Sequence, residues 1–112
     1  MPQICIKPIS VNSCWQGRRF RTDEFKVWQN NVLFQLRKVK MIKGWVRVEL
    51  VFYLKNYGMT DVDNLNKASL DCLVKKGYIE DDRKIVELYS KKIQVKDENK
   101  QGFDFLIEPI IP

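Results

Sequence analysis

Acidic side chains gather in one short stretch of this chain. Asp61 and Asp63 stand at its start, Lys67 follows four residues later, and Asp82 closes it. Carboxylate oxygens are the ligands that hard cations such as Mg²⁺ prefer, and two or three of them can hold an ion beside a phosphate. The pattern predicts a metal site with Asp61, Asp63 and Asp82 as ligands, and with Lys67 near the phosphate.

The same residues also fit a purely structural role. Asp63 could cap a helix, and Lys67 could form an ion pair on a solvated helix face. An EF-hand is a poor alternative, because Leu65 stands at its third ligand position and no glycine follows at the next one. Spacing alone leaves the metal site and the structural role open.

Charge is distributed unevenly along the 112 residues, whose formal net charge is +6. Residues 1–43 hold nine Lys or Arg against two Asp or Glu, whereas residues 44–112 hold eleven against twelve. A basic half beside an acidic cluster is typical of a protein that binds a phosphate backbone and keeps its anionic chemistry local. A mildly basic soluble surface has the same charge pattern.

The absence of histidine and the scattered cysteines limit the possible catalytic groups and metal sites. There is no histidine, so catalysis would depend on carboxylate, Lys, Tyr or a metal-activated water. Cys5, Cys14 and Cys72 have no zinc spacing, and an odd, scattered set indicates a reducing compartment. The sequence has no signal peptide and no apolar run that could span a bilayer. We expect a cytoplasmic protein that is not in a membrane.

One domain, residues 1–112, is expected to position the acidic stretch. Alternating or continuous apolar residues predict strands, and apolar residues three or four apart predict helices. The resulting order is β-α-β-α-β-β, an α+β fold with two helices packed on a mixed sheet. Residues 10–21 are expected to form a loop, and residues 96–102 a hairpin loop. The predicted strands cover residues 4–9, 46–54, 85–96 and 103–110, and the predicted helices cover residues 23–40 and 63–76.

The second helix would present the acidic residues on one side. Asp63, Lys67 and Asp71 are four residues apart and therefore share a face. Asp61 would lie on the same side of an extended segment that leads into the helix. Asp82, which follows the helix, would return to this pocket from a strand end.

The stretch from Asp61 to Ile85 resembles the core motif of the RusA-type Holliday junction resolvases. That motif is D-x-D-N-x-x-K, then an Asp four residues on, a helix that ends near Gly, and an Asp-Asp pair that opens the next strand. Residues 8–21, with a Trp before an Arg-rich stretch, resemble the N-terminal loop of the family more loosely. The matching positions of the core motif are Asp61, Asp63, Asn64, Lys67, Asp71, Gly77, Asp81 and Asp82.

The resemblance implies a homodimeric, Mg²⁺-dependent endonuclease that cuts four-way DNA junctions in recombination and repair, with Mn²⁺ able to replace Mg²⁺. Its essential carboxylates would be Asp61, Asp63 and Asp82, and its catalytic lysine Lys67. A two-fold dimer would nick strands of like polarity symmetrically. The residues expected to support this site are Asn64, Asp71 and Asp81.

Basic side chains outside the motif are expected to hold the DNA backbone without contacting base edges. Arg18, Arg19 and Arg21 form the densest cluster. The loop before Asp61 is less basic than the family resemblance would imply, because it offers only Lys55. Junction binding is therefore expected either to depend more on the three arginines or to be weaker.

Two other interpretations compete with the resolvase. Asp82-Arg83-Lys84 is an Asp-x-Lys at a strand start, a spacing used by restriction-type nucleases, and there Lys84 would be the catalytic lysine. The other is a nuclease-like fold that binds DNA without cutting it.

Overall fold

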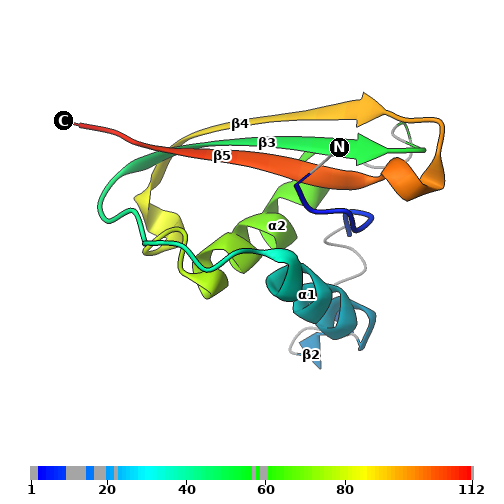
Figure 1. The fold of residues 1–112 in the computed structure, drawn as a ribbon, viewed down its shortest axis with the longest axis horizontal. Helices are drawn as coiled ribbons and strands as arrows, with labels where there is room; N and C mark the ends of the chain where they lie inside the picture. The colour runs from blue at the N-terminus through cyan, green and yellow to red at the C-terminus, as the bar shows by residue number, and fades with distance from the viewer. Residues whose placement is uncertain are drawn as a thin grey trace.

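The structure is a computed structural model, and it describes residues 3–9, 15–16, 20–21, 23–56, 58 and 61–111. Two helices lie on the same side of a three-stranded sheet (Figure 1). Neither of these helices is long and apolar enough to cross a bilayer. The strands are β1 (Trp15–Gln16), β2 (Phe20–Arg21), β3 (Val46–Leu54), β4 (Ile85–Gln94) and β5 (Gly102–Pro109); the helices are α1 (Asp23–Gln35) and α2 (Asp63–Lys76), with the 3₁₀ turns η3 (Asp82–Lys84) and η4 (Glu98–Lys100).

Strand β3 is the centre of the sheet. It pairs in parallel with β4 and antiparallel with β5, so the sheet is mixed. Every second side chain of β3, from Val46 to Leu54, is buried, as the period-two pattern predicts. The α+β class, the mixed sheet and the two packed helices are confirmed.

Helix α2 has the predicted bounds and orientation. Its apolar stripe, which includes Leu65, Ala68 and Cys72, is buried against the core. The helix ends at Gly77, whose φ of 91° lies in the left-handed region that favours glycine. The burial of one face leaves the opposite face of α2, which carries Lys67, toward solvent.

Helix α1 ends at Gln35, earlier than the predicted residue 40. Leu36 is buried and its N–H still donates to the carbonyl of Val32 at 3.0 Å, whereas Val39, the next apolar residue at helical spacing, is 43% exposed. The chain is instead drawn toward the segment after α2, because the hydroxyl of Tyr78 donates to the carbonyl of Arg37 at 2.7 Å and Ile42 forms a bridge with Ile79. These tertiary contacts favour an extended connection over further helical turns.

The predicted strand at residues 4–9 is reduced to one bridge. The N–H of Ile4 donates to the carbonyl of Phe103 at 3.0 Å, and Phe103 returns the bond at 2.9 Å. Further along, Pro8 has no N–H to give, and the carbonyl of Lys7 accepts from the indole of Trp28 at 2.8 Å. The segment therefore packs on α1 and does not extend the sheet. Within residues 10–21, which were predicted as a loop, β1 and β2 form a short antiparallel pair.

The connection between β4 and β5 is not the predicted hairpin. The two strands lie on opposite sides of β3, so residues 96–102 pass over the end of that strand. Lys55, just after β3, holds this crossing: its ammonium is 3.2 Å from Glu98 and its N–H donates to the side chain of Gln101. Strand β3, with every second side chain buried, takes the central position, and a local loop pattern does not specify that position.

Ser69 on α2 is 1% exposed, and its hydroxyl has no hydrogen-bond partner among the described residues. An unsatisfied buried hydroxyl costs about 1–3 kcal/mol, and alanine favours helix more than serine. Ser69→Ala is therefore expected to raise the free energy of unfolding by about 1 kcal/mol, measured by urea denaturation. Ser90→Ala is the matched control: its hydroxyl donates to Asn66 at 2.6 Å, so stability should fall. A loss of stability in Ser69→Ala would contradict this assignment.

Candidate active site

A groove of about 520 Å³ lies where the polar face of α2 meets the segment that precedes β4. Helix α1 contributes one residue to its wall. Most of the lining is charged, and both signs are present. The lining residues are Gln29, Lys67, Asp71, Val74, Lys75, Glu80, Asp81 and Asp82.

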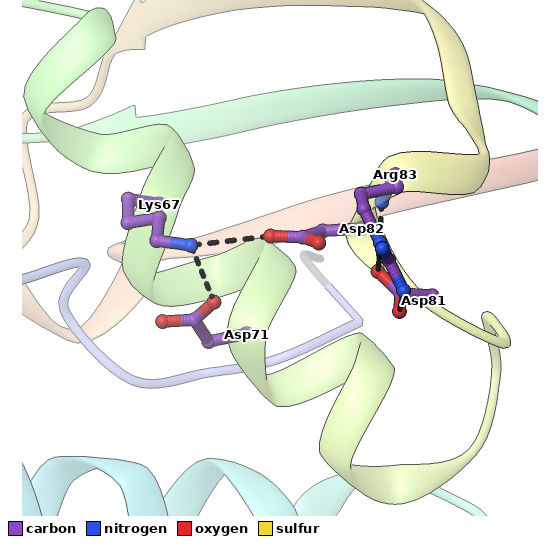
Figure 2. Close-up of polar contacts among 5 residues, drawn as sticks. All are labelled: Lys67, Asp71, Asp81, Asp82 and Arg83. Carbon is purple, nitrogen blue, oxygen red and sulfur yellow. Dashed lines mark hydrogen bonds and ion pairs between the residues drawn. The ribbon is translucent and has the colours of Figure 1, made fainter.

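Lys67 connects two of the predicted acidic residues (Figure 2). Its ammonium is 3.2 Å from Asp71, one helical turn further along α2, and 3.3 Å from Asp82 of η3. The hydrogen bond to Asp71, joined by the contact with Asp82, raises the pKa of Lys67 despite some desolvation. Lys67 is therefore protonated. Asp82, from η3, lies beside Lys67, whereas Asp61 and Asp63, with which it was predicted to share a pocket, do not line this groove.

These ion pairs do not act mainly as stabilising contacts. The side chains of Lys67 and Asp82 are 57% and 50% exposed. Pairs exposed to this extent contribute about 0.2–1 kcal/mol each. Asp71, with its side chain 19% exposed, is the less exposed anchor of the lysine.

Asp81 fixes the turn that carries Asp82. Its carboxylate accepts from the backbone N–H of Arg83 at 2.9 Å and from the guanidinium of the same residue at 3.0 Å (Figure 2). Bonds from Arg83 hold the pKa of the Asp81 carboxyl well below its usual range. A charged Asp81 caps η3 and so sets the direction in which Asp82 leaves the backbone.

Asp61 and Asp63 are both exposed at the start of α2. The predicted extended segment between them is wrong, because Val62 has helical φ and ψ of −59° and −34°. The N–H of Asn64 already donates to the carbonyl of Asp61 at 3.0 Å, so the turn begins there. Residues two apart in a helical turn project about 200° from each other. The two carboxylates therefore do not share a face.

Whether the predicted ligands could hold a divalent ion depends on their donor atoms and on their spacing. All the predicted ligands are carboxylates, the donor type that a hard cation prefers. Among the residues that the structure describes, however, no three acidic, Cys or His side chains come close enough together to hold a metal ion. The kind of ligand fits Mg²⁺, whereas the present spacing of the side chains does not bring three of them to one ion.

The structure describes only some of the predicted DNA-binding residues. Arg18 and Arg19 lie outside the described residues. The backbone of Arg21 belongs to β2, and its side chain is not described. Lys55 lies at the end of β3 beside Glu98, where it holds the β4–β5 crossing. The role of these four residues in DNA binding stays a prediction.

Lys84, the catalytic lysine of the restriction-type alternative, is engaged elsewhere. Its ammonium lies 4.5 Å from the centroid of the Trp45 ring. That is the geometry of a cation–π contact. The lysine that meets Asp82 is Lys67, so the geometry favours the resolvase assignment over the Asp-x-Lys one.

Four residues of the groove were not singled out from the sequence: Gln29, Val74, Lys75 and Glu80. The ammonium of Lys75 donates to the side chain of Gln29 at 3.3 Å, and Glu80 accepts from the N–H of Gly44 at 3.2 Å. Lys75 lies within the predicted second helix but was given no role in the site, and nothing local marks Gln29, because α1 meets α2 through tertiary packing. Glu80 directly precedes the Asp-Asp pair, and that adjacency was the available signal.

Comparison with known proteins agrees with the sequence motif. Residues 11–101 match the family described as endodeoxyribonuclease RusA. A curated relative from Aquifex aeolicus (strain VF5), named crossover junction endodeoxyribonuclease RusA, is 29% identical over 97 residues, which cover 83% of this chain and 75% of the relative. The matched region contains all of the acidic stretch, α2 and the Lys67–Asp82 contact. This chain belongs to the RusA endodeoxyribonuclease family.

Proposed function

We propose that this protein is a Holliday junction resolvase, an endodeoxyribonuclease that cuts four-way DNA junctions during recombination and repair. One observation carries the proposal: Lys67 and Asp82, 15 residues apart in the chain, meet at 3.3 Å on the rim of a charged groove. The family match supports cleavage of DNA, and the name of the relative, a crossover junction endodeoxyribonuclease, supports a junction as the substrate.

The metal belongs to the proposal. Asp61, Asp63 and Asp82 would hold Mg²⁺, with Mn²⁺ able to replace it. Asp61 and Asp63 are exposed, so core packing does not fix their carboxylates in the present orientations. When bound, such an ion would activate a water and neutralise charge that develops on the phosphate.

The residues of the chain itself have separate roles. Lys67, protonated and reachable from the groove, would contact the scissile phosphate and stabilise its charge. Asp81 would hold Asp82 in place through η3, and Asp71 would hold Lys67. Arg18, Arg19, Arg21 and Lys55 would bind the DNA backbone.

A homodimer completes the proposed machinery. A two-fold axis would place two grooves so that both cut strands of like polarity. The reaction would take place in the cytoplasm of a bacterium or of a phage-infected cell.

The test uses a four-way junction labelled on each strand in turn, with Mg²⁺ and with linear duplex as comparison. The wild type is expected to nick two strands of like polarity at symmetric positions and to leave the duplex largely intact. Asp63→Asn, which keeps the shape of the side chain and removes its charge, should bind the junction and cut it more slowly.

Each failure has a distinct meaning. Junction binding without cleavage by the wild type would favour a DNA-binding protein of nuclease-like fold. Equal cleavage of junction and duplex would contradict junction selectivity. Nicks on a single strand would contradict the paired action of a dimer.

A further inference from the structure

Strand β4 forms one edge of the sheet, above both helices in the view of Figure 1. Within the described part of the chain, β3 is the only strand that pairs with it. The four residues from Val86 to Tyr89 are all exposed. Three of them are large and apolar: Val86 is 53% exposed, Leu88 44% and Tyr89 55%. An edge strand of this kind is a ready template for pairing with another chain.

The opposite edge of the sheet, β5, is partly covered by the N-terminal segment. Ile4 exchanges two backbone hydrogen bonds with Phe103, and the side-chain oxygen of Gln3 accepts from the N–H of Phe105 at 2.9 Å. The two edges therefore differ. Among the described residues, β4 is the edge that remains open to a partner.

Charged side chains lie on the sheet face that the helices do not cover. There Arg47 alone pairs with three carboxylates, those of Glu49, Glu87 and Glu108, so negative charge is in excess. The side chain of Glu87 is 63% exposed. Lys91 lies four residues further along β4 on the same face, is exposed, and has no ion pair with any described residue. A strand with this spacing complements an antiparallel copy of itself.

We propose that two copies of this chain associate through β4, antiparallel about a two-fold axis at Tyr89. In this register Tyr89 lies opposite its own copy, Leu88 lies opposite Ser90, and Glu87 lies opposite Lys91 on both sides of the axis. An axis at Leu88 or Ser90 would place Tyr89 opposite a charged residue, and an axis at Glu87 would oppose two glutamates. Cross-strand charge pairing therefore favours the axis at Tyr89.

This arrangement joins the two sheets into one sheet of six strands. Because the axis is perpendicular to that sheet, the helices of both copies lie on the same face. The two grooves, which α2 and η3 form with α1, then lie on the same side of the dimer. This inference rests on the proposed function for the use of the dimer, whereas the interface rests on β4 itself.

The experiment measures the dimer Kd by analytical ultracentrifugation, with the full chain and without DNA or divalent metal. The wild type is expected to dimerise. Glu87→Lys and Lys91→Glu each place like charges on both sides of the axis, and each should weaken the dimer about 10- to 50-fold. The double variant exchanges the two charges, so it should recover most of the wild-type affinity.

Mixing the two single variants tests whether the contact joins two copies. In an equimolar mixture of Glu87→Lys and Lys91→Glu, every charge at the interface can meet its opposite. A heterodimer tighter than either homodimer is therefore expected. Lys38→Glu is the matched control, because it makes the same charge change at an exposed residue that follows α1. It should alter the Kd by about twofold or less, through general charge alone.

Three results would each overturn the interface: a monomeric wild type, equal effects of Lys91→Glu and Lys38→Glu, or no recovery in the double variant. Circular dichroism establishes that each variant is folded. If Glu87→Lys is not, Lys91→Glu decides alone, since it leaves the Arg47 ion pairs intact.

Junction cleavage by the wild type is measured separately. Paired nicking by a wild type whose dimer ignores Lys91→Glu would sink this inference and leave the proposed function intact. A dimer that responds as expected but leaves junctions uncut would support the interface and contradict the proposed function.

Discussion

Lys67→Ala is expected to slow junction cleavage by about 10²- to 10⁴-fold, the range for loss of one group that stabilises charge or transfers a proton in the reaction. Lys67 is the lysine in contact with Asp82, and its pKa is raised by Asp71 and Asp82, so it offers a permanent positive charge to the phosphate. The measurement is single-turnover cleavage of a labelled junction at saturating protein.

The control is Lys84→Ala, which removes the same side chain two residues from Asp82. Because Lys84 lies against Trp45, its loss should change the rate only a few-fold. The opposite ranking of the two variants would make the protein a restriction-type nuclease. More Mg²⁺ should not rescue Lys67→Ala, since the variant loses a phosphate contact and no metal ligand; rescue would contradict the assigned role.

The sequence predicted those parts of the fold that depend on a pattern within one helix or strand. The alternation in β3 and the apolar stripe of α2 are periodic patterns with one buried face, and both elements have the predicted bounds. Helix α1 was predicted too long because Val39 has helical spacing from Leu36, yet Leu36 makes the last bond to the helix and Val39 is exposed beyond it. The place of β3 between β4 and β5 is a property of the whole sheet, and no loop composition encodes it.

The site residues also fall into those that a local pattern predicted and those that it did not. The spacing of Lys67 and Asp71 places them on one helix face, and the family motif named Asp82 as their companion; the structure joins all three. Asp61 and Asp63 were assigned to one face on the assumption of an extended backbone. Val62 has helical φ and ψ, so the two carboxylates project in different directions. Residue types do not determine the backbone conformation of a single residue at a helix start.

Phe103→Ala is expected to lower the free energy of unfolding by about 3–5 kcal/mol. Phe103 is fully buried, its ring centroid lies 6.1 Å from that of Phe52, and its backbone exchanges two hydrogen bonds with Ile4. Truncation leaves a cavity under the sheet at the point where the N-terminal segment is attached. A domain of this size has about 5–15 kcal/mol of stability in total, so the variant would be close to unfolding at 37 °C.

The same substitution on the surface provides the comparison. Phe34 on α1 is 90% exposed, and Phe34→Ala should change stability by no more than about 0.5 kcal/mol. Thermal melts by circular dichroism measure both, with about 4 °C of shift per kcal/mol in a chain of this length. Similar losses in the two variants would mean either that Phe103 is not a core residue or that Phe34 is covered in solution. Since a dimer is proposed, melting Phe34→Ala at several protein concentrations separates these cases: a covered Phe34 gives a concentration-dependent loss, whereas a misplaced Phe103 does not.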